Sequence, residues 1–303
     1  MSSAPFALPE IIAGARRRAT VSPAPSGTLA FDAPQTIPVV QAPAARLAGW
    51  LAEHELPVSL VYIDPPFAAE RDFHFSTGDR RLAYSDKWAS LDAYLASMRE
   101  VLEQVRAALL PEGSLLLHCD HRASPYLAIL CDEIFGMGDR GPRGQPGFRN
   151  ELIWSYGLGG SSARCYPKKH DTILWYSKGA AWNFDPPMVP ATSNRLAGQL
   201  KKAPDVLNIP TINNMAGERC GYPTQKPLAL LELLVKAHTR PGDLVVDLFS
   251  GSGTTAVAAI RSGRHAIVGD IGVEGIRVTA ERIAAAGGVP TIYDAEVGNV
   301  AED

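Results

Sequence analysis

Short apolar runs that suit buried strands alternate along this chain with longer segments that repeat apolar residues at helical spacing. The strand-like runs are residues 59–63, 114–118, 150–155, 172–177, 244–248 and 265–269. The helix-like segments are residues 44–55, 91–109, 124–135, 228–238, 254–262 and 273–286. This alternation predicts crossover connections between parallel strands. We therefore expect an α/β fold with a doubly wound, mostly parallel sheet.

The composition excludes several classes of protein. Of the 303 residues, 46% are hydrophobic and 20% are charged, which is typical of a chain with a large core and not of a disordered one. No apolar run approaches the roughly 18 residues of a transmembrane helix, and no apolar signal segment follows the arginines at 16–18. The four cysteines form no CxxC pair, as expected of reduced thiols in a cytoplasmic protein.

Positive charge is concentrated in the middle of the chain. Residues 140–222 hold eleven Lys and Arg against five Asp and Glu, which gives +6; the whole chain has −3, so the remainder has −9. A basic segment in an acidic protein is a candidate footprint for a polyanion, and the alternative is a solvated loop region. Regular periodicity also fades over residues 178–222, which we interpret as an inserted recognition region.

A glycine-rich turn follows the strand-like run that contains Asp247 and opens the next helix. It reads Phe249-Ser250-Gly251-Ser252-Gly253-Thr254-Thr255. Such glycines let the backbone approach a ligand closely, and the helix N-terminus favours an anionic group. Asp270 ends the next strand, where an acid can accept hydrogen bonds from a ribose diol. The turn lacks both the Gly-Lys-Ser/Thr of a P-loop and the third glycine of GxGxxG, so S-adenosylmethionine (SAM) fits better than NAD.

A stiff turn, Asp64-Pro65-Pro66-Phe67, ends the first of these strand-like runs. Proline fixes φ and lacks an N–H group, so the turn presents acceptors at the end of the sheet where α/β folds bind ligands. The Asp64 carboxylate and the Pro65 carbonyl suit the two protons of an exocyclic amine, and Phe67 offers a face for a stacked base. Hydrogen bonds to both protons favour a pyramidal nitrogen whose lone pair can attack a methyl group. The alternative is a bulged strand end that Asp64 caps.

Together the two motifs resemble those of the DNA methyltransferases that act on adenine N6 or cytosine N4. Their order, with the proline motif first and the glycine motif near the C-terminus, resembles the circularly permuted beta group of that family. Similar stretches cover most of residues 56–285. The resemblance implies a Rossmann-like, SAM-dependent methyltransferase fold. Residues 40–43 lack the acidic turn that relatives often carry before the catalytic motif.

The same resemblance divides the chain into five segments. They are a Pro/Ala-rich arm over 1–38, a catalytic half over 39–177, a target-recognition insert over 178–222, a SAM-binding half over 223–290 and a C-terminal tail over 291–303.

Residue by residue, the resemblance implies three sets of functional side chains. The flipped base would be held by Asp64, Pro65, Pro66 and Phe67. The cofactor would be held by Thr224, Lys226, Asp247, Phe249, Gly251, Gly253, Thr254, Thr255 and Asp270. In that set Lys226 would lie beside the methionine carboxylate and Asp270 on the ribose. DNA phosphates would be contacted by Arg164, Lys168, Lys169, Arg195, Lys201 and Lys202.

The predicted activity is site-specific transfer of a methyl group from SAM to adenine N6 of a base flipped out of double-stranded DNA. Asp64 before the two prolines implies adenine, and a cytosine-N4 methyltransferase is the nearest alternative. Methylation of RNA or of a protein side chain, or a catalytically inactive DNA-binding or regulatory protein, are the others. Intact Asp64 and intact glycines argue against the last. His118, Asp120 and His121 are interpreted as polar groups at a strand end, so no metal site is expected.

The resemblance also implies a setting. It indicates a bacterial or phage-encoded protein of the cytoplasm, acting either in a restriction–modification pair or as an orphan enzyme. A homodimer and a cognate restriction endonuclease are the protein partners that it leaves open.

Overall fold

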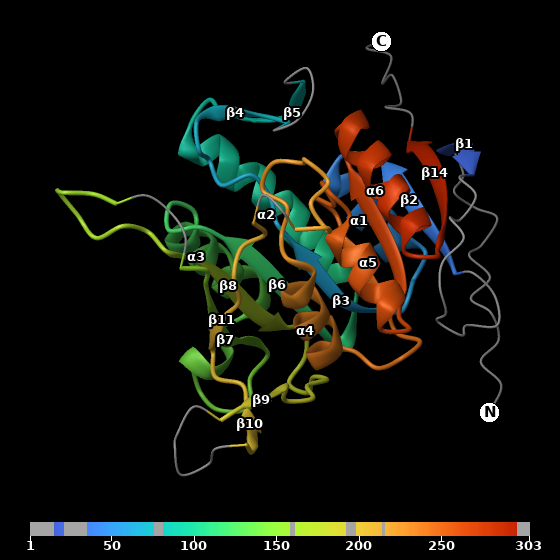
Figure 1. The fold of residues 1–303 in the computed structure, drawn as a ribbon. Helices are drawn as coiled ribbons and strands as arrows, with labels where there is room; N and C mark the ends of the chain where they lie inside the picture. The colour runs from blue at the N-terminus through green and yellow to red at the C-terminus, as the bar shows by residue number, and fades with distance from the viewer. Residues whose placement is uncertain are drawn as a thin grey trace.

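Ten strands form the central sheet of the protein (Figure 1). The computed structural model describes residues 15–20, 35–75, 81–157, 161–191, 198–213 and 216–295. In chain order the sheet strands are β1 (Ala15–Thr20), β2 (Thr36–Gln41), β3 (Val58–Ile63), β6 (Leu109–Cys119), β7 (Gly147–Ser155), β8 (His170–Ser177), β11 (Val206–Asn208), β12 (Leu244–Asp247), β13 (His265–Asp270) and β14 (Val289–Ala295). Their order across the sheet is β1-β14-β2-β13-β12-β3-β6-β8-β7-β11.

Most neighbours in this sheet are parallel. Antiparallel pairing occurs where β8 meets β6 and β7, and where β1 meets β14. The chain steps outward from the centre in two directions: β3 is followed across the sheet by β6, and β12 by β13. The expected doubly wound, mostly parallel α/β fold is therefore confirmed.

Helices cover both faces of the sheet. They are α1 (Ala44–Glu53), α2 (Leu91–Ala108), α3 (Ser124–Phe135), α4 (Leu228–His238), α5 (Thr254–Arg261) and α6 (Val273–Ala285), with a short 3₁₀ helix η1 (Gly138–Arg140). Two hydrophobic clusters result, one beneath α1, α2 and α3 and the other beneath α4, α5 and α6. Within β3, Val61 and Ile63 face the first cluster and Leu60 and Tyr62 the second, because successive side chains of a strand point to opposite faces.

The predicted helices begin and end close to where capping and periodicity place them. In α2, the Ser90 side chain accepts a hydrogen bond from the Ala93 N–H at 3.1 Å, which satisfies one free donor of the first turn. Tyr94, Met98 and Leu102 recur at helical spacing and are buried against the sheet. Both α3 and α4 have the predicted bounds. Among the described residues, no helix is long and apolar enough to cross a membrane.

Several predicted boundaries need correction. The arm was expected to reach residue 38, but β2 starts at Thr36 and lies inside the sheet between β13 and β14. The tail was expected from residue 291, but β14 continues to Ala295 and pairs with β2. Proline in each strand obscured its apolar pattern. The strand expected over residues 114–118 instead begins at Leu109 as β6, where a register shift against β3 accommodates the extra residues.

Two hairpins were not predicted. The first consists of β4 (Arg71–His74) and β5 (Leu82–Asp86), which follow the turn Asp64–Phe67 in the chain. The second consists of β9 (Met188–Pro190) and β10 (Leu200–Lys202) within the predicted insert. The insert also contributes β11, which pairs in parallel with β7 at the sheet edge. Part of the presumed recognition region is therefore a component of the central sheet.

A buried histidine at the end of α4 predicts acid sensitivity. His238 is 2% exposed and lies edge-on to Trp175, with ring centroids 4.5 Å apart. Burial lowers the pKa of His238 from 6.5 to about 3. Below about pH 6.5 the unfolded chain takes up a proton that the folded chain refuses, so stability is full above that pH and falls toward pH 3. From about pH 7 to pH 5 we expect this group to lower the free energy of unfolding by about 2 kcal/mol.

Urea unfolding at the two pH values measures this contribution. His238→Leu removes the titrating group, so its free energy of unfolding should depend less steeply on pH than that of the parent chain, whatever its absolute stability. An equal pH dependence in both proteins would contradict the assignment.

Candidate active site

The carboxyl ends of the neighbouring strands β3, β12 and β13 lie side by side and surround a cavity of about 370 Å³. β3 and β12 are neighbours, and the chain leaves them in opposite directions across the sheet. Open α/β sheets bind ligands at such a switch point, because the diverging connections leave a crevice there. The size of the cavity suits a small organic molecule.

The turn Asp64–Phe67 is held in place by the β4–β5 hairpin. Asp64 follows directly on the buried strand β3. The backbone N–H groups of Phe67 and Ala69 both donate to Asp86 Oδ2, at 3.0 and 2.9 Å, and the Trp88 indole donates to Asp86 Oδ1 at 3.0 Å. Asp86 is 1% exposed at the end of β5. Sequence reasoning missed Asp86, whose carboxylate fixes the shape of the turn after the two prolines.

The glycine turn is fixed by the acid on the next strand. Gly251 has φ +47 and its N–H donates to Asp270 Oδ2 at 2.8 Å, while Gly272 N–H donates to Asp270 Oδ1 at 2.7 Å. Burial raises the pKa of Asp270 against these two bonds, which lower it. Gly253 has φ +74, and a Cβ atom there would lie 2.9 Å from Thr279 Cα. The left-handed backbone favours glycine at both positions, and at Gly253 a Cβ atom would also crowd the α6 backbone.

A second buried acid faces the same cavity. Asp247 accepts a hydrogen bond from Thr255 Oγ1 at 2.5 Å and another from the Phe249 N–H at 3.0 Å. Burial nevertheless raises the pKa of Asp247 to about 7. A cationic ligand nearby would favour the ionised form. Asp247 therefore suits a positively charged group at this end of the cavity.

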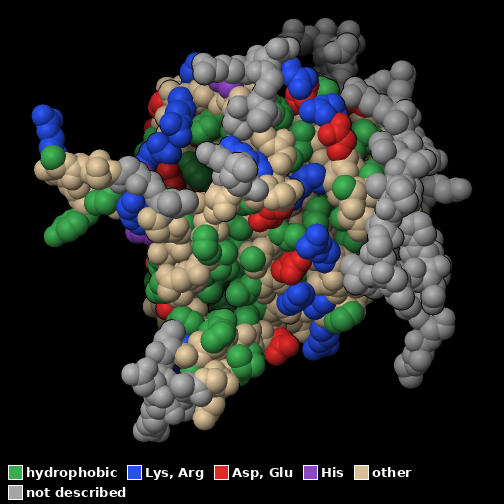
Figure 2. Space-filling model, viewed as in Figure 1, with side chains coloured by type: hydrophobic (Ala, Val, Ile, Leu, Met, Phe, Trp, Pro, Cys, Tyr) green, Lys and Arg blue, Asp and Glu red, His purple; other side chains and the backbone are tan. Residues whose placement is uncertain are grey.

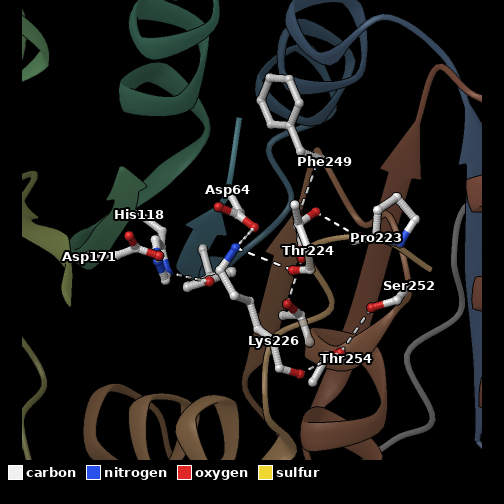
Figure 3. A network of polar contacts seen from close by, with 12 residues as sticks. Asp64, His118, Asp171, Pro223, Thr224, Lys226, Phe249, Ser252 and Thr254 are labelled. Atoms are coloured by element: carbon white, nitrogen blue, oxygen red, sulfur yellow. Dashed lines mark hydrogen bonds and ion pairs between the residues drawn. The ribbon is translucent and has the colours of Figure 1, made fainter. Parts of the chain in front are cut away.

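The segment before α4 brings a lysine to the Asp64 carboxylate. Lys226 Nζ forms an ion pair with Asp64 Oδ2, and it lies 3.5 Å from the Thr224 carbonyl oxygen (Figure 3). Thr224 has φ 60, a left-handed conformation that is strained for a β-branched residue. Lys226 was predicted to lie at the methionine end of the cofactor. In the structure its ammonium contacts Asp64, at the start of the Asp64–Phe67 turn.

A buried polar network lies behind the turn Asp64–Phe67 and was also missed. His118 is fully buried; its Nδ1 lies 2.9 Å from the Tyr62 hydroxyl and its Nε2 lies 3.3 Å from Asp171 Oδ2. Burial acts to raise the pKa of Asp171, but the His118 hydrogen bond and the nearby charges of His118 and Lys226 outweigh it and lower the pKa. The His118 ring lies nearly parallel to the Phe67 ring, with centroids 6.2 Å apart. The network therefore reaches Phe67 through the stacked His118 ring.

The structure brings the predicted catalytic and cofactor residues together. All of them line the cavity except Gly253, which is packed against α6 behind the glycine turn. The cavity wall also includes residues that were not predicted, among them Tyr62, Tyr84, Tyr222, Leu231 and Ile271. No sequence motif marks them, because they come from separate elements.

The predicted DNA-contacting residues do not share one face. Arg164, Lys168 and Lys169 lie in the connection from β7 to β8, at the same end of the strands as the cavity. This connection projects from the body, with Lys and Arg side chains on it (Figures 1 and 2). Lys201 and Lys202 lie on β10, which directly precedes β11. Because β11 runs parallel to β7, β10 lies near the opposite end of the strands from the cavity. Arg195 lies outside the described residues.

The residues of the cavity fit SAM. The free N–H groups at the start of α5 suit a carboxylate, Asp247 suits a cationic group, and Asp270 can accept from a ribose hydroxyl. Ile271 is 69% exposed at the mouth and offers an apolar surface for an aromatic ring. Within the part of the chain that the structure describes, no group of three or more His, Cys, Asp or Glu could hold a metal ion.

The fold and site together define a class of protein. A doubly wound sheet with a glycine turn at a helix N-terminus and an acid on the next strand is an arrangement that binds adenosine-containing cofactors. Residues 58–281 match the family model for DNA methylases that act at N6 or N4. The chain belongs to this N6/N4 DNA methylase family.

Curated relatives carry consistent names. The chain is 28% identical over 243 residues to the DNA adenine methyltransferase YhdJ of Escherichia coli (strain K12), which covers 75% of this chain and 76% of that protein. It is also 28% identical over 231 residues to the Type II methyltransferase M.HpaI of Haemophilus parainfluenzae, covering 75% and 68% of the two chains.

Solved structures share the fold. The M1.HpyAVI–SAM complex superimposes with a TM-score of 0.58 at 22% identity, covering 82% of this chain and 98% of that one. PvuII DNA methyltransferase, which is cytosine-N4-specific, gives a TM-score of 0.57 at 19% identity, covering 84% and 93%. The expected methyltransferase fold is thereby confirmed.

Proposed function

We propose that this protein transfers a methyl group from SAM to the N6 amine of adenine in double-stranded DNA. The observation that carries the proposal is the position of Asp64. Its carboxylate opens onto the same cavity as the glycine turn, and its Oδ1 is buried without a hydrogen-bond partner among the described residues. A buried acceptor without a donor is unfavourable, and an exocyclic amine supplies the missing donor.

The chemistry requires an activated amine held close to a methyl donor. When bound, SAM supplies an electrophilic methyl group. Asp64 Oδ1 and the Pro65 carbonyl would accept the two amine protons and hold the nitrogen in a pyramidal form. The hydrogen bonds from Phe67 and Ala69 to Asp86 keep the turn rigid, so the acceptors need not reorganise during the reaction. Phe67, backed by His118, would stack on the flipped base.

Adenine is the base that we favour. Asp64 before the two prolines is typical of the adenine enzymes, and YhdJ is named as an adenine methyltransferase at 28% identity. Cytosine N4 is the second candidate, because the matched family covers DNA methylases that act at either N6 or N4. Sequencing plasmid DNA with a modification-sensitive method after expression of the protein would identify both the base and its recognition site.

Duplex DNA is the nucleic acid that we infer as substrate. RNA or a protein side chain would be the alternative acceptor of the methyl group. Competition of duplex DNA, single-stranded DNA and RNA of one sequence for a labelled methyl group decides between them. Preferential transfer to RNA would contradict the proposal.

DNA binding is predicted to depend on the loop between β7 and β8. Lys168→Gln with Lys169→Gln should weaken binding and reduce the slope of log affinity against log salt by about 1.8, because each phosphate contact contributes about 0.9. Binding of a labelled duplex between about 50 and 200 mM salt measures that slope. The matched control is Lys201→Gln with Lys202→Gln on β10, which should change the slope little. Equal effects of the two pairs would contradict a binding face at the cavity edge.

We further infer how the segments divide the work. Residues 209–213 and 216–222, which lie between β11 and the cavity-lining segment at Thr224, and the loop between β7 and β8 would read the target sequence. The name of M.HpaI as a Type II methyltransferase supports a bacterial restriction–modification setting with a cognate endonuclease. A homodimer belongs to the same proposal and is measured by analytical ultracentrifugation.

A further inference from the structure

Lys226 occupies an unexpected place for a residue expected at the cofactor. Its side chain is 10% exposed and that of Asp64 is 17% exposed. The backbone carbonyl of Lys226 accepts from Thr254 Oγ1 at 3.3 Å, so the residue begins beside the glycine turn. Its side chain then extends away from that turn toward Asp64 (Figure 3). The ammonium lies 5.6 Å from the centroid of the Phe67 ring.

The hydrogen-bonding capacity of the pair is only partly used. An ammonium has three donors, and the described residues supply two acceptors, Asp64 Oδ2 and the Thr224 carbonyl. Asp64 Oδ1 has no partner among them. One donor and one acceptor therefore remain side by side, next to the aromatic face of Phe67. Burying a charged pair carries a desolvation cost that two apolar residues would avoid. A functional requirement for both charges would explain why Asp64 and Lys226 are nevertheless charged.

Adenine carries the complementary pattern on one edge. Its exocyclic N6 presents donors, and the adjacent ring nitrogen N1 is an acceptor. A carboxylate alone recognises only the amine, whereas a carboxylate beside an ammonium recognises both atoms. We propose that Lys226 is a specificity-determining residue that donates a hydrogen bond to N1 of the target adenine while Asp64 accepts from N6. This inference rests on the proposed adenine methylation and adds the contact that recognises the ring.

The competing role for Lys226 is neutralisation of the SAM carboxylate. Two observations favour the base. Nζ is already on the carboxylate of the base-binding motif, and the start of α5 offers backbone N–H groups for an anion without it. Lys226 also lies close enough to Asp171, behind Phe67, to lower the pKa of that acid.

The test removes the ring nitrogen and the ammonium separately and together. The full-length protein and Lys226→Met would be assayed on duplexes whose target adenine is replaced by 1-deazaadenine or, as the matched control, by 7-deazaadenine. Both analogues keep the N6 amine, and single-turnover methylation rates are compared. Lys226→Gln, which keeps a neutral donor, serves as a second variant in case Lys226→Met does not fold.

We expect loss of N1 to slow the parent protein about 10- to 100-fold more than it slows Lys226→Met, as for a hydrogen bond to a charged donor. Replacement of N7 should slow both equally. The affinity of Lys226→Met for SAM, measured by calorimetry, should stay within about threefold of the parent.

Equal sensitivity of parent and variant to the loss of N1 would overturn the inference, as would coupling to N7 alone. So would a large loss of SAM affinity in Lys226→Met without any coupling to N1. None of these outcomes bears on adenine methylation itself, because the parent protein acting on unmodified adenine is measured in the same series. Failure of that reference reaction would instead contradict the proposed function.

Discussion

Asp64→Ala is expected to lower the rate of methyl transfer to DNA by about a hundred- to a thousandfold, the usual loss when a preorganised polar contact at the reacting group is removed. Asp64 Oδ1 is the buried acceptor that faces the cavity, and it has no hydrogen-bond partner among the described residues. The single-turnover rate with radiolabelled SAM measures the effect. SAM affinity should be nearly unchanged, because the glycine turn is held by Asp270 and not by Asp64.

Two further variants separate catalysis from the fate of Lys226. Asp64→Asn keeps one oxygen acceptor and should lose less activity than Asp64→Ala. Asp64→Ala leaves the Lys226 ammonium without its ion-pair partner, so the double variant with Lys226→Met controls for an unpaired buried charge. Near-normal methylation by Asp64→Ala would show that the catalytic assignment is wrong.

The second large effect is expected at the cofactor. Asp270→Ala should weaken SAM binding by about 10- to 100-fold, because the Asp270 carboxylate holds the glycine turn through Gly251 and Gly272 and is the proposed acceptor for the ribose. Calorimetric titration of the purified protein with SAM measures the dissociation constant. The loss should appear in binding without any DNA present.

A matched control for this variant lies at the other end of β12. Asp243 also accepts a hydrogen bond from a backbone N–H, that of Arg240 at 2.8 Å, but it precedes the strand and lies away from the cavity. Asp243→Ala should leave SAM affinity within about twofold of the parent. Equal weakening in both variants would point to general destabilisation and not to a cofactor contact.

Local sequence signals predicted most of the fold and the two walls of the site. The apolar run before Asp64 and the glycines before α5 identify strand ends, and parallel strands bring those ends to one edge. The β4–β5 hairpin was missed because its strands are short and alternate weakly. Because that hairpin was not predicted, no sequence signal indicated that Asp86 would contact the turn Asp64–Phe67.

Contacts between distant residues explain the rest of what was missed. His118 and Asp171 are 53 residues apart and meet because β8 runs antiparallel to β6 in a sheet expected to be mostly parallel. Lys226 and Asp64 are 162 residues apart. Charge counted along the sequence grouped Lys168 with Lys201. Between them, however, β8 carries the chain from the cavity end of the strands to the opposite end. Such pairings depend on topology, which no local pattern reports.

The most direct measurement is the identity of the methylated nucleoside. Duplex DNA incubated with the protein and isotopically labelled SAM would be digested to nucleosides and analysed by mass spectrometry, with Asp64→Ala as the matched control. The label is expected in N6-methyladenine with the parent protein and is expected to be nearly lost with the variant. Label in N4-methylcytosine would contradict the assignment of adenine, and label in neither base would contradict DNA methylation by this site.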